Sequence, residues 1–237
     1  MPDFSTEELH TYLSDVIGDR WPTIPADVRA TLRRPLLARL YRDVASSAIW
    51  QPTSEYELYK KFWNRLYTGT QADYPMDADI LKRAAYALTQ QDENYPWTVA
   101  QLSDNATIQR LIKVGWLRSP QLGWYEVWHN RLLNWAVAEG LAHELYHRRL
   151  DTAKTCQIIQ QLHSSPGLRR PRFLGYVPMD FLWLITEPAL GMDDLAVQVL
   201  EAMELASRVM SQPDQMYLHL ARIFHKKGQT SSKSLIE

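Results

Sequence analysis

The stretch WLRSPQLGWYEVWHN, from Trp116 to Asn130, is the part of this chain where strand-type side chains interrupt a helical pattern. It reads as two short strands around a Ser-Pro-Gln-Leu-Gly turn. The side chains that favour strands here are Trp124, Tyr125, Val127 and Trp128. Helical patterns flank the stretch, TIQRLIKVG at 107–115 before it and a longer one from about Asn130 to about Arg149 after it. We therefore expect one small β-hairpin between helices, the order of elements in a winged helix.

The remainder of the chain predicts helices. Near the amino terminus, Ser5 and Glu8 have the spacing of a capping box, and Gly18 is a stop signal for that first helix. Pro35 falls where the first turn of another helix is expected, since proline is tolerated there. A further helix is rich in aromatic side chains: Tyr56, Tyr59, Phe62 and Trp63. The predicted fold class is therefore mainly α.

Three segments follow from these patterns. Residues 1–92 are expected to form a helical domain, residues 93–150 the winged-helix domain, and residues 151–237 a C-terminal helical segment. The density of helices in the last segment resembles the start of a helical-repeat array, in which each helix pair buries its face against a neighbour. In such an array the outer end exposes apolar side chains to a missing repeat or a partner: Leu218, Ile223 and Phe224.

Composition excludes several classes of protein. With 46% apolar residues, 11% aromatic residues and nine tryptophans among 237 residues, the chain has ample material for a core. A net charge of −1 gives no global electrostatic reason for binding nucleic acid or an anionic membrane. A single cysteine, Cys156, rules out an internal disulfide framework. The first residues lack a signal-peptide pattern and no apolar run approaches the ~18 residues of a membrane helix, so we expect a cytoplasmic protein without a membrane partner.

The heptapeptide LAHELYH, Leu141 to His147, contains the pattern H-E-x-x-H. On a helix, His143 and His147 are neighbours and could hold zinc, with Glu144 as the base of a metallohydrolase. Against this, Arg148 and Arg149 flank the motif with positive charge. No downstream candidate for a third ligand stands out by its spacing: Glu187, Glu201 and Glu204. The favoured interpretation is a pair of helix-surface histidines and no metal site.

Two longer stretches resemble a known family. LIKVGWLRSPQLGWYE followed by VWHNRLLNWAVAEGLAHEL resembles the winged-helix domain of STAND-class (NACHT-like) signalling NTPases, in which the second strand of a hairpin leads through a histidine into a helix. That histidine is His129 here. Upstream, FSTEELHTYL and DVRATLRRPLLARLYRDVA resemble the helical domain that lies between the ATPase core and the winged helix in that family. The resemblance covers about residues 4–150.

The resemblance implies a nucleotide contact at two positions. Pro35 would pack against the adenine, and His129 would touch the β-phosphate of ADP and so hold an inactive state closed. Arg33 stands where the family usually has glycine in a G-x-P element. The adenine contact of Pro35 is inferred from that element, so the sequence departs from the family pattern at this point. A histidine at a strand-to-helix junction can also simply cap the helix, which is what the residues favour when the resemblance is set aside.

No G-x-x-x-x-G-K-[ST] loop occurs in the sequence. Such a loop supplies the backbone cradle and the lysine for the phosphates, so we expect no ATP hydrolysis and no enzymatic activity. The chain is interpreted as the regulatory and interaction portion of a STAND-like NTPase, acting as a nucleotide-sensing lid and an oligomerisation or signalling scaffold. ADP or ATP would bind only if a separate NTPase core completed the site. That core, or another protein, is the expected partner.

A winged helix can also bind DNA, which is the alternative of a different class. The helix near 107–114 would then enter the major groove, with Gln109, Arg110 and Lys113 as the reading side chains. That helix has only two positively charged side chains and the hairpin turn has none, so few contacts to the DNA phosphates are available. Nucleic acid is therefore not the favoured partner, and a static scaffold remains the second hypothesis.

Overall fold

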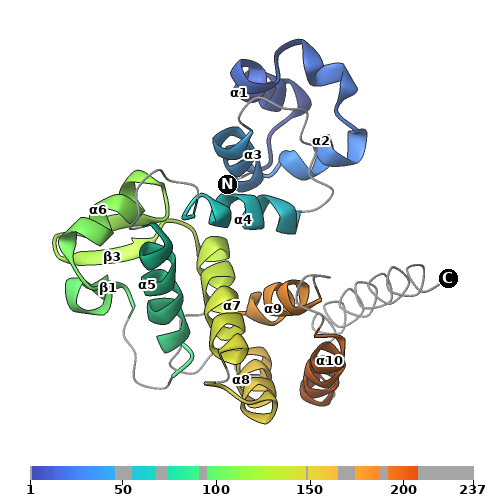
Figure 1. Cartoon of the computed structure of the whole chain (residues 1–237). Coiled ribbons are helices and arrows are strands. Elements are labelled where there is room, and N and C mark those ends of the chain that lie inside the picture. Colours follow the sequence, from blue (N-terminus) through green and yellow to red (C-terminus); the bar gives the residue numbers. More distant parts are fainter. Residues whose placement is uncertain are drawn as a thin grey trace. The chain divides into compact units, whose positions relative to one another are not determined.

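The chain is mainly helical, with one small antiparallel sheet of three strands (Figure 1). The computed structural model describes residues 2–45, 55–67, 74–90, 95–147, 149–164, 174–186 and 192–207. The chain divides into two compact units, Met1–Tyr74 and Pro75–Glu237. The predicted fold class is confirmed. The division between the units falls after Tyr74, whereas the sequence pattern placed the end of the helical domain at residue 92.

The first unit consists of helices, and local signals explain their ends. They are α1 (Thr6–Ile17), the 3-10 helix η1 (Gly18–Thr23), α2 (Ala26–Leu32), α3 (Pro35–Val44) and α4 (Glu55–Asn64). At the start of α1, Ser5 Oγ accepts a hydrogen bond from the Glu8 amide at 3.2 Å, and Glu8 Oε2 accepts one from the Ser5 amide at 2.7 Å. Gly18 has a φ of +53°, a conformation that glycine adopts at little cost. The predicted capping box and stop are both confirmed.

The core of this unit lies among α1, α3 and α4, because α3 packs against both α1 and α4. Leu9 and Leu13 from α1 and Leu37 and Leu40 from α3 are fully buried. The aromatic residues of α4 complete this core: Tyr56, Tyr59, Phe62 and Trp63. Pro35 is the first residue of α3, as predicted.

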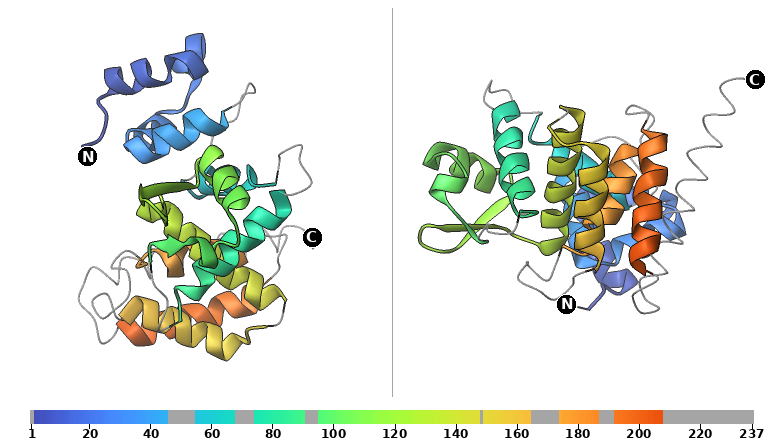
Figure 2. Two further views of the ribbon diagram at one scale, coloured as in Figure 1. Left: turned by 90° about the vertical axis from the view of Figure 1, so that its left-hand side faces the viewer. Right: turned by 90° about the horizontal axis from the view of Figure 1, so that it is seen from below.

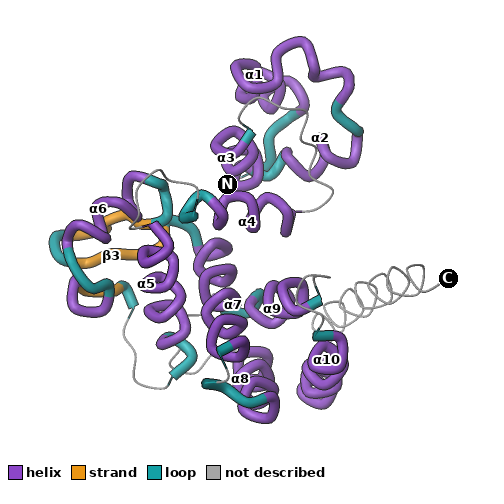
Figure 3. Tube along the Cα trace, in the orientation of Figure 1, coloured by secondary structure: helices purple, strands orange, loops and turns teal. Residues whose placement is uncertain are grey.

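The region predicted to be a winged helix lies in the second unit. Its elements are α5 (Tyr74–Ala87), β1 (Trp97–Thr98), the 3-10 helix η2 (Val99–Gln101), α6 (Asn105–Lys113), β2 (Leu117–Gln121), β3 (Trp124–Val127) and α7 (Asn130–Tyr146). The strands lie in the order β1-β3-β2, so that β1 pairs with the second strand of the hairpin (Figure 3). This order of helices and strands is consistent with the predicted winged helix. The hairpin was predicted, whereas β1, with only two residues, was not.

The hairpin turn is shorter than the predicted Ser119–Gly123 segment and lies at its end. Gln121 pairs with Trp124, so the turn consists of Leu122 and Gly123, and Gly123 has a φ of +80°. Pro120 lies within β2, which is an edge strand and therefore tolerates a residue without an amide hydrogen. The glycine determines the turn because it adopts a left-handed backbone without strain.

Helix α7 is the central element of the second unit. It is buried along most of its length, including every residue from Arg131 to Ala138. The helices that follow are α8 (Thr152–Ser164), α9 (Val177–Ile185) and α10 (Asp193–Ser207). Helix α9 packs against α7, and α10 packs against α8 (Figure 2). Leu218, Ile223 and Phe224 lie outside the described residues, so a helical-repeat array stays a prediction.

Candidate functional site

His129 stands at the junction where the hairpin leads into α7. Its backbone is extended, with φ −145° and ψ 133°, and its Nδ1 accepts a hydrogen bond from the Arg131 amide at 3.1 Å. The ring thus satisfies one of the amides that the first turn of a helix leaves without an intrahelical partner. The capping role that the sequence allowed for His129 is therefore present, and it fixes the direction of the ring.

The cap also determines which nitrogen carries the proton. Because Nδ1 accepts, the neutral ring must carry its hydrogen on Nε2. Nε2 has no hydrogen-bond partner among the residues that the structure describes, and the side chain is exposed. Desolvation of part of the ring lowers the pKa of His129, and the positive charges of Arg131 and Arg118 lower it further. At neutral pH His129 therefore offers one outward N–H donor on an uncharged ring.

Arg131, two residues further on, points inward and ties α7 to α9. Its side chain forms a bidentate ion pair with Asp180, with Nη2 at 2.6 Å from Oδ1 and Nη1 bound to Oδ2. Arg131 is 8% exposed and Asp180 is 0% exposed. The guanidinium also lies over the ring of Tyr176, with 4.8 Å between Cζ and the ring centroid. This is a buried charged pair of the kind whose partners depend on each other.

Asn134 adds a second connection between the same two helices. Its Oδ1 accepts a hydrogen bond from the Tyr176 amide at 3.0 Å, and its Nδ2 donates to the Asn130 carbonyl at 2.7 Å. Together with the Arg131–Asp180 pair, it fastens the beginning of α9 to the beginning of α7, one turn from His129. The sequence analysis missed this cluster. Its signal was a polar residue inside each of two apolar helical runs, Asn134 in RLLNWAVA and Asp180 in VPMDFLWLI.

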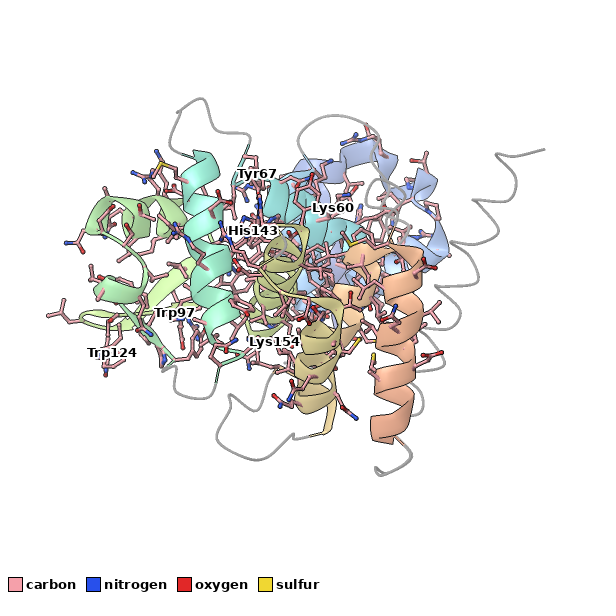
Figure 4. All side chains as sticks on the ribbon, turned by 60° about the horizontal axis from the view of Figure 1, so that its bottom comes forward. Lys60, Tyr67, Trp97, Trp124, His143 and Lys154 are labelled. Atoms are coloured by element: carbon pink, nitrogen blue, oxygen red, sulfur yellow. The ribbon has the colours of Figure 1, made fainter. Side chains whose placement is uncertain are left out.

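The wing places a second cation near the junction. Arg118 on β2 pairs with Glu126 on β3, with 2.7 Å between Nη2 and Oε1, and 61% of the Arg118 side chain is exposed. The strand ahead of the junction is held from the other side, because the Val127 amide donates to the Tyr95 hydroxyl at 3.0 Å. Trp124 lies towards the outer end of the hairpin, and Trp97 lies further in (Figure 4). The hairpin is thus anchored where it meets His129.

Tyr95→Phe is expected to lower the free energy of unfolding by about 1–2 kcal/mol at pH 8, because it leaves the Val127 amide without its acceptor. Burial is the main reason that the pKa of Tyr95 is raised far above its usual value. The native chain therefore keeps this stabilisation below the unfolded-state pKa of about 10 and loses it as the pH rises further. Urea titrations at pH 8 and pH 11 should show the gap between native and variant chains narrowing. A gap that is constant across this range would contradict the assignment.

Pro35 belongs to the first unit and His129 to the second. Pro35 is half-buried at the first position of α3, behind Arg34, which pairs with Glu55 at 2.5 Å. Arg33, at the position of the family's glycine, exchanges hydrogen bonds with Phe4: its Nε donates to the Phe4 carbonyl at 2.7 Å, and the Phe4 amide donates to its carbonyl at 2.8 Å. The contact of Pro35 with an adenine therefore stays a prediction.

The H-E-x-x-H residues lie at the end of α7. The rings of His143 and His147 have centroids 4.4 Å apart, and His143 Nε2 is 3.9 Å from Asp79 Oδ1 on α5. Glu144 is buried and lies 3.3 Å from Arg149 Nη1. Within the described part of the chain, no three His, Cys, Asp or Glu side chains are grouped so as to hold a metal ion. Glu201 is exposed on α10, and the side chains of Glu187 and Glu204 lie outside the described residues.

The three side chains proposed to read DNA have different surroundings. Arg110 forms a bidentate pair with the buried Asp77, with both distances 2.7 Å, and also donates to Thr107 Oγ1. Gln109 and Lys113 are exposed on α6. Arg110 therefore holds α6 to α5, and its fork of donors is already used.

The chain matches no family model, no curated protein and no solved structure. Among the described residues, none of the helices has the length and apolar character needed to cross a membrane.

Proposed function

We propose that this chain is a non-catalytic regulatory module of the STAND type, in which His129 contacts a phosphate of a nucleotide held by a partner NTPase core. The observation that carries the proposal is the geometry of His129. Its Nδ1 is occupied by the helix cap, so that its Nε2–H points outward from the end of a winged helix. Because the cap already fixes the ring, its N–H can donate a hydrogen bond to an anion without a further loss of side-chain entropy.

The residues at the junction fit one phosphate group and not a whole nucleotide. The ring offers one donor, the amino-terminal end of α7 carries a partial positive charge, and Arg118 and Arg131 add a positive potential. The sequence has no phosphate-binding loop, so the remaining contacts must come from another protein or chain segment. The binding of nucleotide would then depend on association, as expected of a lid.

The same geometry suggests how a signal would pass on. The Arg131 amide donates a hydrogen bond to His129 Nδ1, and the buried Arg131 side chain forms an ion pair with Asp180 on α9. A change at His129 would therefore reach the C-terminal helices through one residue. The lid and these helices would respond together as one element biased by the nucleotide. This supports the proposed scaffold role of the C-terminal segment.

His129→Ser is expected to weaken ADP-dependent association with the proposed partner, a P-loop NTPase core of the STAND type, by about 10–100-fold, the loss of one hydrogen bond to a charged group. Serine is a good helix cap, so this variant retains the cap and removes only the long donor. Association is measured by titrating labelled chain with the co-expressed core, with and without ADP.

His10→Ala serves as the matched control, because His10 is an exposed histidine of the first unit. It should associate as the native chain does. Association that is independent of ADP, or equal for His129→Ser and the native chain, would reject the proposal. Equal melting temperatures for the two His variants would confirm that the comparison concerns the donor and not the fold.

The two other functions have less support. In the DNA-binding alternative, Arg110 would have to leave Asp77, which is 1% exposed, and the hairpin tip from Ser119 to Tyr125 has no charge for phosphates. In the metallohydrolase alternative, the base Glu144 would have to act from a buried position beside Arg149. Neither arrangement favours the chemistry required.

A further inference from the structure

His129 lies between two points at which the chain is fastened to its surroundings. Before it, the Val127 amide donates to the Tyr95 hydroxyl at 3.0 Å. After it, Arg131 is held by its buried ion pair with Asp180 on α9. The three residues between these two points connect the hairpin to α7, and His129 is the middle one. The conformation of His129 therefore decides how the hairpin and α7 are joined.

The hydrogen bond that fixes this conformation requires a neutral ring. His129 Nδ1 accepts from the Arg131 amide at 3.1 Å, which it can do only while Nδ1 carries no hydrogen. A protonated imidazole carries a hydrogen on each nitrogen, so that two donors would face each other at this place. The positive end of the α7 dipole also disfavours a cation at the helix start. Protonation and capping therefore exclude each other.

Two guanidinium groups from different elements also oppose a charge on the ring. Burial of part of the ring lowers the pKa of His129, and the charges of Arg131 on α7 and Arg118 on β2 lower it further. The carboxylates of this region are engaged with these two cations, Glu126 on β3 with Arg118 and Asp180 on α9 with Arg131. The ring is therefore neutral at pH 7 and becomes protonated below the ordinary value of about 6.5.

We propose that His129 is a proton-sensitive switch at the junction of the hairpin and α7: the neutral ring caps α7 and fixes the junction, and the protonated ring releases the cap. The release is confined to the junction, because the contacts of Tyr95 and Asp180 hold the chain on either side of it. The hairpin, which carries Arg118, is then free to change its direction relative to α7. The switch lies within this chain, so it operates whether or not a nucleotide is bound at Nε2.

The test follows the Arg131 amide and the His129 ring of the full ¹⁵N-labelled chain by NMR from pH 7.5 to pH 5. Both signals should change with one shared midpoint below about pH 6.5. Below that midpoint, the protection of the Arg131 amide against hydrogen exchange should fall about fivefold, the factor that corresponds to the loss of a typical helix cap.

His129→Asn is the matched variant. Asparagine places an acceptor oxygen at the branch position of Nδ1, is a good helix cap and does not titrate in this range. Its Arg131 amide should keep the same protection from pH 7.5 to pH 5. His10→Ala removes an exposed histidine of the first unit and should retain the native transition. Far-UV circular dichroism at pH 5 will verify that all three chains are folded.

Urea titrations give a second readout. Because the pKa of His129 is lower in the folded chain than its ordinary value, the neutral ring stabilises the folded chain fully above about pH 6.5. This stabilisation is lost as the pH falls through the folded-state pKa. The native chain should therefore lose stability relative to His129→Asn between pH 7.5 and pH 5.

An Arg131 amide that does not follow the titration of the His129 ring would overturn the switch. The same conclusion would follow if this amide responded equally in His129→Asn, or if the difference in stability between the two chains were constant with pH. The nucleotide contact is tested separately by ADP-dependent association at neutral pH, so the two proposals can fail independently.

Discussion

Asp180→Ala is expected to lower the free energy of unfolding of the second unit by about 3–5 kcal/mol, the usual effect of removing one partner from a buried ion pair. Asp180 is fully buried and binds both terminal nitrogens of Arg131. Alanine removes this bidentate carboxylate and leaves the charge of a guanidinium that is 8% exposed. Urea denaturation followed by far-UV circular dichroism will measure the difference.

Two further variants make this prediction specific. Asp194→Ala removes an exposed carboxylate near the start of α10 and should change stability by less than about 0.5 kcal/mol. The double variant Arg131→Met with Asp180→Leu replaces the pair by apolar side chains and should regain most of the lost stability, because no buried charge then remains. If Asp180→Ala costs as little as Asp194→Ala, the pair does not hold α9 to α7.

The ends of the elements could be predicted where one or two residues determine them. Ser5 with Glu8, Gly18 and Pro35 act within a single turn, and the structure has their helices start and stop as expected. The hairpin was also predictable, because a run of strand-type side chains is a local signal. The predicted turn, Ser119 to Gly123, includes the observed one but is longer, because Pro120 is a common turn residue and yet fits an edge strand, while Gly123 supplies the positive φ that the turn needs.

The missed features depend on residues far apart in the sequence. The strand β1 has two residues, too few for any alternation, and it exists only because β3 pairs with it. Arg131 and Asp180 are 49 positions apart, and Arg110 and Asp77 are 33 apart. Nothing in a local pattern indicates which buried acid meets which buried base. These pairs form because of how the helices pack on one another. The sequence of each helix taken alone does not predict that packing.

The candidate site was predicted in part. His129 was identified as the residue between the hairpin and the next helix, and that position is confirmed. The sequence could not give the direction of its ring, which depends on the cap with the Arg131 amide. It also could not indicate that Arg110 is held by Asp77, a contact that removes the strongest candidate for reading DNA.

Gly140→Leu is expected to destabilise the second unit by about 3 kcal/mol or more, because α5 cannot keep its place against a side chain at this position. A Cβ at Gly140 would lie 2.5 Å from the Lys82 carbonyl oxygen and 3.1 Å from both the amide nitrogen and the Cβ of Tyr86. Two of these three atoms belong to the backbone of α5, so the clash is relieved only if the helix moves. Thermal denaturation will report the loss.

Gly140→Ala separates packing from helix propensity, since the two effects have opposite signs. In an open helix interior, alanine in place of glycine stabilises by about 1 kcal/mol. Here the single added carbon meets α5, and the net change should be destabilising by about 1–3 kcal/mol. Gly175→Ala is the matched control, because an added Cβ there meets nothing within 4 Å, and it should be neutral. A Gly140→Ala chain that melts higher than the native one would show that α5 and α7 do not pack this closely.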